Sequence, residues 1–316
     1  MNSIRPRLHG YAALLVALAV GCLAPCVLAD DGASSDSGGQ RFRARAAERR
    51  ARMVDAQGAV EMQYGSDPLQ KLDYWRAAAP NAPLVVFVHG GAWKSGDKRN
   101  AVSAEKIRHF LYRGYGFASL NYRLYPAVAV EDEVQDVAAA LAFLVARAET
   151  LGFDARRVVL MGHSAGAHIA ALIGTDPRHL RKAGLELTAL RGVVLLDGAG
   201  YDVPRQIAGG SSLHGTYGEV FGGGRERQIA LSPTHQAAAP NVAAFLILYV
   251  QRPDGIAQSQ ALAEALRQAG TAVEIHGYAG RGLAGHLEIN RRLGDPSYPA
   301  TPDVDEWLKQ VFGESP

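Results

Sequence analysis

The chain has 316 residues, of which 48% are hydrophobic and 20% are charged, and its formal net charge is +2. This composition is typical of a globular protein with enough apolar side chains to form a large core. The near-neutral charge argues against a nucleic-acid partner.

The first 29 residues are predicted to be a secretory signal peptide. Arg5 and Arg7 precede an apolar run that ends on the small-residue site Val27-Leu28-Ala29. The run is too short for a comfortable membrane span, so we expect export to the periplasm or the medium and no integral span in the mature chain. An uncleaved anchor is one alternative. A lipoprotein anchor at Cys22 is another, although Ala19 stands where such signals usually have a larger aliphatic residue.

Residues 30–58 are predicted to form a disordered or weakly helical tether, rich in Ser, Gly and Asp at first and in Arg later. We interpret its arginines as a solvated face rather than a contact with an anionic surface. The only two cysteines, Cys22 and Cys26, lie in the predicted signal. The mature chain is therefore expected to have no disulfide and no thiol nucleophile.

Residues 59–316 are predicted to form one α/β domain. Apolar stretches typical of buried strands alternate with segments of helical periodicity, as in strand 83–90, helix 101–114, strand 116–124 and helix 131–152. This alternation predicts a mostly parallel central sheet with helices on both faces and a site at the carboxyl ends of the strands. Residues 200–240 are rich in Gly and weakly periodic, so we expect a short cap-like excursion over that site rather than a separate domain.

The stretch "VVLMGHSAGAHIAAL" places Ser164 where a buried strand runs directly into an apolar helix. Such a turn is sharp, so residues two positions away must be tiny, and Gly162 and Gly166 meet that need. The turn exposes the hydroxyl above the sheet edge and aims the N–H of Ala165 at a developing oxyanion. Ser164 is therefore the predicted nucleophile. The alternative is that Ser164 is only a helix N-cap.

A serine nucleophile needs a base and an orienting acid, which should follow it in the order acid, then histidine, after later strands. Asp254 follows the apolar run "FLILYV", and His286 follows the strand pattern "AVEIHGYA" and a Gly-rich loop. These two residues are the predicted acid and base. An ordinary Asp-Gly turn is the alternative for Asp254. The rival candidates for the two roles are His214, His235, His276, Glu264, Glu274, Asp295, Asp303 and Asp305.

The loop "VHGGAWKSGDK" also follows a buried strand. Its two glycines let the backbone approach a substrate closely, so the N–H groups of Gly91 and Ala92 are the remaining predicted oxyanion donors. No Cys, His or carboxylate cluster has the spacing of metal ligands, and no cofactor is expected.

At these residues the sequence resembles the α/β-hydrolase superfamily. The blocks "YGSDPLQKLDYW", "HGGAWKSGDK", "NYRL", "GHSAGAH" and "GHLEINRRLG" are similar to the branch of hormone-sensitive-lipase-like esterases, bacterial feruloyl-type carbohydrate esterases and kynurenine formamidases. The resemblance spans roughly residues 60–313. It implies an α/β-hydrolase fold with Ser164, Asp254 and His286 as a triad, and with Gly91, Ala92 and Ala165 as oxyanion donors. Two departures are Gln251, where many relatives have Gly, and Ala92, in place of the third glycine of "HGGG".

The expected function is that of an exported serine carboxylesterase acting on small-molecule esters, short-chain or linked to an aryl or carbohydrate group. An arylformamidase-like amidase is the first alternative, and a non-catalytic hydrolase-fold binding protein is the second. The complete set of nucleophile, acid, base and oxyanion loop argues against a binding protein.

Overall fold

The structure is a computed structural model that describes residues 58–99, 101–209, 214–238 and 240–313. The predicted signal peptide and almost all of the predicted tether lie outside these ranges. Among the helices of the described ranges, none is both long and apolar enough to cross a bilayer.

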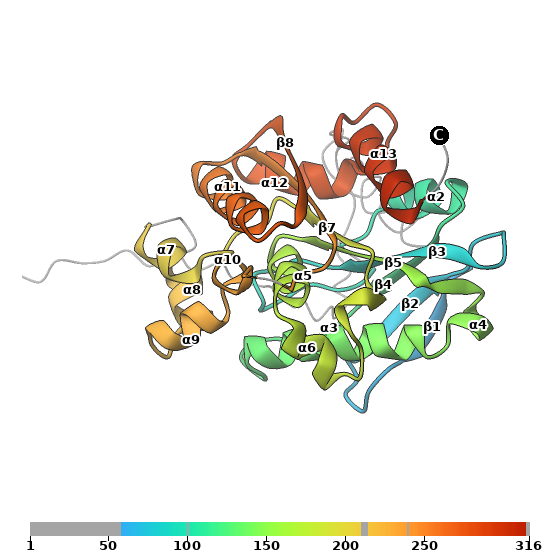
Figure 1. The fold of residues 1–316 in the computed structure, drawn as a ribbon, viewed down its shortest axis with the longest axis horizontal. Helices are drawn as coiled ribbons and strands as arrows, with labels where there is room; N and C mark the ends of the chain where they lie inside the picture. The colour runs from blue at the N-terminus through green and yellow to red at the C-terminus, as the bar shows by residue number, and fades with distance from the viewer. Residues whose placement is uncertain (1–57, 100, 210–213, 239, 314–316) are drawn as a thin grey trace, which may run out of the picture. The chain divides into compact units, whose positions relative to one another are not determined.

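The centre of the molecule is an eight-stranded sheet with the strand order β1-β2-β4-β3-β5-β6-β7-β8 (Figure 1). Strands β1 and β2 are antiparallel to their neighbours, and β3 to β8 pair in parallel. The predicted mostly parallel sheet is confirmed. The strands are β1 Val60–Gln63, β2 Lys71–Trp75, β3 Ala82–Val88, β4 Gly116–Leu120, β5 Phe153–His163, β6 Gly192–Leu196, β7 Ala244–Gln251 and β8 Ala272–Arg281.

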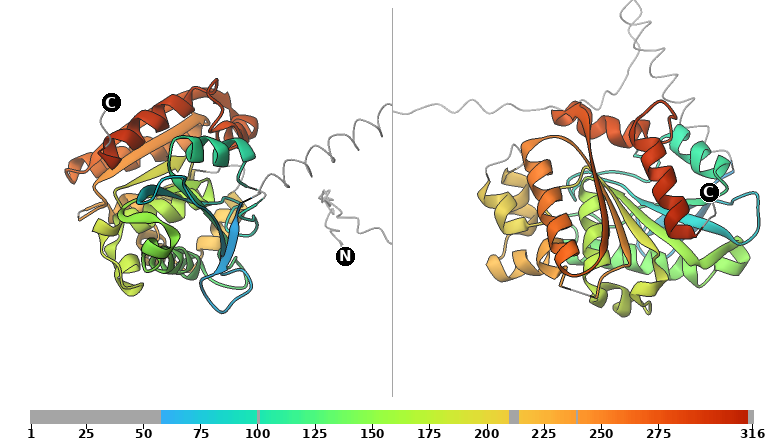
Figure 2. Two further views of the ribbon diagram at one scale, coloured as in Figure 1. Left: turned by 90° about the vertical axis from the view of Figure 1, so that its right-hand side faces the viewer. Right: turned by 45° about the horizontal axis from the view of Figure 1, so that its top comes forward.

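Helices cover both faces of this sheet, as predicted, and Figure 2 shows them from two further directions. Side chains of β3 alternate between two apolar cores: Leu84 packs in the core beneath α3, α5 and α11, and Val85 packs in the core beneath α2, α12 and α13. The main helices are α2 Ala104–Tyr112, α3 Val130–Val145, α5 Ala165–Thr175, α11 Pro253–Gln268, α12 Gly282–Arg292 and α13 Ala300–Phe312.

Four local features differ from the sequence interpretation. The Gly-rich loop expected before His286 is largely helical, because α12 begins at Gly282. The single helix expected over residues 131–152 is two helices, α3 and α4 (Ala148–Leu151), and α4 ends at Gly152 in the left-handed conformation. Strand β1 was not expected, because an exposed edge strand lacks the apolar run of a buried one. Two short elements, α6 (Pro177–Lys182) and the 3-10 helix η1 (Leu187–Ala189), precede β6.

The excursion between β6 and β7 contains four short helices where we expected little regular structure. They are α7 Val203–Ala208, α8 His214–Phe221, α9 Arg225–Ala230 and α10 Pro233–Gln236. Helices of one or two turns are too short to give a readable periodicity, which explains why the pattern predicted an irregular segment.

Candidate active site

Ser164 lies at the junction of β5 and α5, where the backbone turns sharply. Its φ is 56° and its ψ is −120°, a left-handed conformation that is uncommon for a residue with a side chain. Its backbone N–H donates to the carbonyl of Leu196 on the next strand at 3.1 Å. Its hydroxyl makes no capping hydrogen bond to α5. The side chain therefore does not serve as a helix N-cap, and the strained turn projects it from the sheet edge.

The two flanking glycines are required by close contacts between backbones. A Cβ at Gly162 would lie 2.2 Å from the carbonyl oxygen of Gly166. A Cβ at Gly166 would lie 2.3 Å from the carbonyl oxygen of Val88 on the neighbouring strand. These distances are far below any van der Waals contact, so the predicted steric reason for both glycines holds at these positions.

The side chain of His286 reaches Ser164 from α12, just after β8. Its Nε2 lies 3.0 Å from the Ser164 hydroxyl oxygen, and its Nδ1 lies 2.6 Å from Oδ2 of Asp197. A carboxylate accepts, so Nδ1 carries the proton and Nε2 is left to accept from the serine hydroxyl. The three side chains thus form one directed chain of hydrogen bonds, and the structure brings together two of the three predicted triad residues.

The carboxyl group in this chain belongs to Asp197, and the assignment of Asp254 to that position is wrong. Asp197 directly follows β6 and is fully buried. Besides His286, its carboxylate accepts hydrogen bonds from Arg252 Nε at 2.8 Å and from the backbone N–H of Val250 at 3.0 Å. Burial by itself raises the pKa of Asp197, but the hydrogen bond from His286 and the charge of Arg252 outweigh it and hold the pKa below its ordinary value.

Asp254 lies in the first turn of α11, away from His286. Its Oδ2 accepts a hydrogen bond from Gln206 at 3.3 Å and lies 3.5 Å from Nη1 of Arg252. An acidic residue in a first helical turn is favoured by the N-terminal end of the helix dipole. A signal for Asp197 was present in the sequence, since "VVLLDG" is also an apolar strand that ends directly on an aspartate.

A second histidine, His163, lies beside the base. Its ring centroid is 4.6 Å from that of His286, and its Nε2 donates to the main-chain carbonyl of His286 at 2.9 Å. Burial, followed by the nearby His286, lowers the pKa of His163 well below the ordinary value, so the ring is neutral. Two rival histidines lie elsewhere: His235 faces Asp202 at 3.3 Å, and His276 faces Glu274 at 3.6 Å.

The loop after β3 has three consecutive residues with positive φ: Gly91 at 137°, Ala92 at 54° and Trp93 at 61°. A Cβ at Gly91 would lie 1.8 Å from the carbonyl oxygen of Ser95, so a larger residue cannot be accommodated there. A Cβ at Gly90 would lie 2.7 Å from Cβ of Ser164, which places this loop directly against the serine. The predicted donors Gly91 and Ala92 directly follow Gly90 in this loop, and Ala165 directly follows Ser164 in the chain.

Trp93 anchors this loop against the excursion. Its ring packs edge-on against Phe221 and Tyr217 of α8 and against His168 of α5, and its indole N–H donates to Nδ1 of His168 at 3.3 Å. An ion pair of 2.8 Å between Lys94 and Glu219 joins the same two segments. The excursion thus packs on the loop beside Ser164.

Comparisons with known proteins agree on the kind of fold that carries this site. A family model described as BD-FAE matches residues 73–188, which include Ser164 and the loop after β3. Esterase B from Lactobacillus Rhamnosis has a similar structure, with a TM-score of 0.67 and 20% identity over 87% of this chain and 92% of that one. A thermophilic esterase, Est2 of Thermogutta terrifontis, has a TM-score of 0.66 and 23% identity over 81% of this chain and 95% of that one.

The fold of the chain is the α/β-hydrolase fold of these esterases. Among curated proteins, the chain is similar to a probable isoprenylcysteine alpha-carbonyl methylesterase of Oryza sativa subsp. japonica, at 38% identity over 34% of the chain and 26% of the relative. It is also similar to a kynurenine formamidase of Meyerozyma guilliermondii, at 34% identity over 46% of the chain and 54% of the relative. The chain thus spans about a quarter to a half of the length of these relatives, and the predicted resemblance is confirmed.

In the part of the chain that the structure describes, no three His, Cys, Asp or Glu side chains gather closely enough to hold a metal ion. His286 contacts the Ser164 hydroxyl and Asp197, and Asp197 is held by Arg252. His163 is bonded to the main chain of His286. In this arrangement, His286 can remove the proton of the Ser164 hydroxyl, and Asp197 can stabilise the imidazolium that results.

Proposed function

We propose that the protein is a serine carboxylesterase that hydrolyses small-molecule esters by way of an acyl-enzyme. The observation that carries the proposal is the hydrogen-bonded chain from Ser164 through His286 to Asp197, at 3.0 Å and 2.6 Å. The strained backbone of Ser164 and the adjoining loop at Gly91 and Ala92 support it, because together they supply a nucleophile and nearby N–H donors.

In the acylation step, the Ser164 oxygen attacks the ester carbonyl carbon while Nε2 of His286 takes the hydroxyl proton. The resulting imidazolium is stabilised by the Asp197 carboxylate. The negative charge that develops on the carbonyl oxygen is met by the N–H groups of Gly91, Ala92 and Ala165. The tetrahedral intermediate then collapses, the bond to the alcohol oxygen breaks, and His286 returns its proton to the leaving alcohol.

In the deacylation step, water takes the place of the alcohol. His286 removes a proton from the water as its oxygen attacks the acyl carbon, and the bond to the Ser164 oxygen then breaks. The proton passes from His286 back to Ser164, so the enzyme returns to its starting state and releases a carboxylic acid. Each step needs only the three side chains and the donors described above.

We expect short acyl chains to be preferred over long ones. The four helices of the excursion are four to eight residues long, and a lid over an extended acyl chain would need a longer apolar surface. The Lys94–Glu219 ion pair places charged side chains at this edge of the site, which suits a polar rim. The similar Thermogutta terrifontis esterase has been solved with butyrate bound, which is in keeping with a small acyl group.

The test combines covalent labelling with a substrate series. A fluorophosphonate probe should label the full chain at Ser164, as located by peptide mass spectrometry, and Ser164→Ala should abolish the label. Values of kcat/KM for acetyl, butyryl, octanoyl and dodecanoyl esters of one alcohol measure the discrimination between acyl groups. Each methylene adds about 0.8 kcal/mol of binding only if a groove buries it. A preference for chains longer than about ten carbons would therefore reveal a long acyl groove and contradict the short-chain expectation.

An arylformamidase-like activity is the second candidate, favoured by the similarity to a kynurenine formamidase over 46% of this chain. The same triad would attack a formamide carbonyl and release formate and an arylamine. Adding an N-formyl arylamine to the substrate series separates the two functions. A formamide with a higher kcat/KM than every ester would replace the esterase proposal by the amidase one.

We further propose that the protein is exported after removal of residues 1–29. The support is the pattern described above: Arg5 and Arg7, an apolar run and the site Val27-Leu28-Ala29. The intact mass of the exported protein should correspond to a mature N-terminus at Asp30. A retained Met1 or a lipid attached to Cys22 would contradict this cleavage.

A further inference from the structure

The loop that carries the proposed oxyanion donors Gly91 and Ala92 is held in a conformation that it would not adopt alone. Ala92 and Trp93 are both non-glycine residues with positive φ, a conformation that is strained for a residue with a side chain. Such strain persists only where the surroundings over-determine the backbone. Trp93 anchors one side of the loop against α8, so a second anchor is needed on the side that leads to α2.

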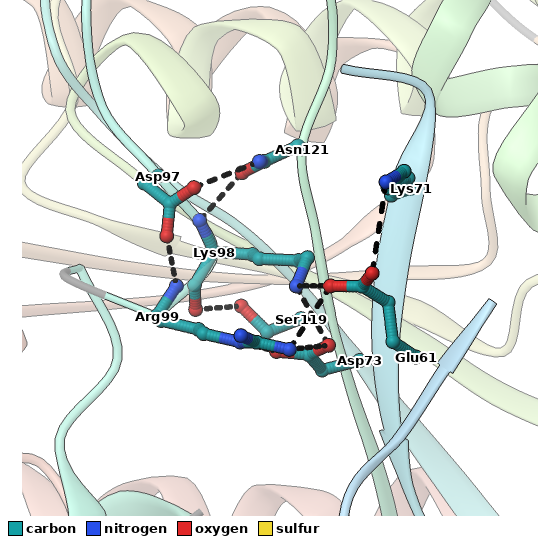
Figure 3. A network of polar contacts seen from close by, with 8 residues as sticks. All are labelled: Glu61, Lys71, Asp73, Asp97, Lys98, Arg99, Ser119 and Asn121. Carbon is teal, nitrogen blue, oxygen red and sulfur yellow. Dashed lines mark hydrogen bonds and ion pairs between the residues drawn. The ribbon is translucent and has the colours of Figure 1, made fainter. Parts of the chain in front are cut away.

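That second anchor is a network of polar contacts made by three consecutive residues, Asp97, Lys98 and Arg99 (Figure 3). Oδ2 of Asp97 accepts from Asn121 at 2.9 Å. The backbone carbonyl of Lys98 accepts from the Ser119 hydroxyl at 2.7 Å. Side chains and backbone of this segment are thus both tied to β4 and the residue that follows it.

The charges of the network follow a row across three strands. Glu61 on β1 pairs directly with Asp73 on β2, and Asp73 pairs directly with Ser119 on β4. Two carboxylates opposite one another on neighbouring strands repel, which destabilises the sheet edge unless cations lie between them. Lys98 and Arg99 supply two such cations, and Figure 3 shows both reaching across this row.

The contacts are short and partly buried. Nζ of Lys98 lies 2.6 Å from Asp73 and 2.9 Å from Glu61, and the side chains of Lys98 and Asp73 are 4% and 0% exposed. Nε of Arg99 lies 2.6 Å from the second oxygen of Asp73. Burial raises the pKa of Asp73, but the hydrogen bonds from Arg99 and Lys98 lower it further, so the group stays a carboxylate.

A buried ion pair is weak evidence for stability, because desolvation offsets most of the attraction between the charges. Its better-attested role is to select one arrangement of the chain. The segment it fixes is separated from the oxyanion donors by one tight turn, in which the carbonyl of Gly91 accepts from the N–H and the hydroxyl of Ser95, each at 3.1 Å. Fixing residues 97–99 therefore limits where Gly91 and Ala92 can place their N–H groups.

We propose that Lys98, held by Asp73 and Glu61, is a positioning residue for the oxyanion-binding loop at Gly91 and Ala92. The side chain of Lys98 contacts Asp73 and Glu61, and Lys98 acts through the backbone of the loop. The proposal rests on the proposed esterase function, since it assigns the network to the step in which negative charge forms on the carbonyl oxygen.

The test is Lys98→Met in the full chain, compared with the wild type on a matched pair of substrates, an ester and its thionoester. Sulfur is a poor hydrogen-bond acceptor, so the thionoester depends much less on correctly placed N–H donors. A misplacement of about 1 Å costs roughly 10²-fold, so we expect kcat/KM for the ester to fall roughly ten- to a hundred-fold. The thionoester value should fall by less than about three-fold if the loss lies at the donors.

The matched control is Lys71→Met, which removes the same charge from the same network. Nζ of Lys71 lies 3.7 Å from the other oxygen of Glu61 and makes no contact with residues 97–99. It should leave both substrates within about two-fold of the wild type, as is usual for exposed ion pairs. If Lys98→Met does not fold, Arg99→Gln is the second variant, because the Arg99 side chain is 48% exposed and tolerates change more readily.

Equal losses on the ester and the thionoester, or an unchanged ester rate, would overturn the positioning role. Thermal unfolding of each variant, measured in parallel, separates a global loss of structure from a local one. A wild type that neither hydrolyses esters nor takes up a fluorophosphonate label would instead defeat the proposed function itself, so the two failures are distinguishable.

Discussion

The carboxyl ends of β6 and β7 lie side by side, with Leu196 paired with Leu248, and each is followed by an aspartate. Asp197 comes directly after β6, is fully buried and accepts from His286, Arg252 and the Val250 N–H. Asp254 comes three residues after β7, in the first turn of α11, with a side chain that is 30% exposed.

The difference supports the proposed role of Asp197 as the acid that orients His286. At the end of β6, the backbone N–H of Val250 and the side chain of Arg252 both donate to the carboxylate of Asp197. These two contacts fix the carboxylate in place independently of its hydrogen bond with His286. At the start of α11, the carboxylate has one weak hydrogen bond and access to water. Arg252 lies between the two and is the contact they share.

The largest effect is expected when the residues that define the site are removed. Ser164→Ala and His286→Ala should each lower kcat by roughly 10⁴-fold or more, and the double variant should be little worse than either single one, because the triad acts as a unit. Steady-state hydrolysis of an acetyl ester measures both. These losses are the reference against which the effects at the two aspartates are compared. If the loss in the double variant equalled the product of the two single losses, Ser164 and His286 would act independently.

An intermediate effect is expected at the residue that the two aspartates share. Arg252→Met removes a charged hydrogen bond to Asp197, which should cost roughly ten- to a hundred-fold in kcat/KM. The pKa of Asp197 is lowered in the folded protein. The stability that its carboxylate contributes to the folded site is therefore present above the ordinary pKa and is lost as the pH falls through the folded pKa.

Loss of Arg252 removes one of the causes of that lowering. The acid limb of the profile of kcat/KM against pH should therefore move to higher pH in Arg252→Met. The wild type measured in the same buffers is the control. A limb that stays in place while the rate falls would mean that Arg252 acts on the substrate rather than on Asp197.

The smallest effect is expected beside Asp254. Gln206→Leu removes the hydrogen bond of 3.3 Å to Asp254 and leaves that carboxylate to water. Activity on short esters should stay within about two-fold, because this contact is long and lies outside the hydrogen-bonded chain from Ser164 through His286 to Asp197. A loss as large as that of Arg252→Met would show that the Asp254 side of the pair matters to catalysis after all.

Much of the site could be predicted from the sequence because its signals are local. The tight turn at Ser164, its two glycines and the loop at Gly91 are each encoded within a few residues and one flanking strand. His286 follows from chain order. The acid could not be assigned in this way, because Asp197 and Asp254 both follow buried strands, and the choice depends on how closely each end approaches a histidine about 90 or 30 residues further along the chain.

The fold shows the same division. Most buried strands and long helices were predicted, because their periodicity is read over many residues. The exceptions among the long helices are residues 131–152, which form two helices, and α12, which begins where a Gly-rich loop was expected. Strand β1 and the short helices of the excursion were missed, since they depend on tertiary contacts such as the Glu61–Lys98 pair and the packing of Phe221 on Trp93. The sequence pattern of a segment indicates which of its side chains are buried. It says much less about which distant segment those side chains pack against.

The most direct test of the account compares Asp197→Asn with Asp254→Asn in kcat/KM for one short-chain ester. Asparagine keeps the size of the side chain, so both variants should fold, as circular dichroism can verify. We predict a loss of roughly 10⁴-fold for Asp197→Asn, as expected when an imidazole is held in the wrong tautomer, and a change of less than about three-fold for Asp254→Asn. A large loss for Asp254→Asn with Asp197→Asn near the wild type would contradict the assignment of Asp197.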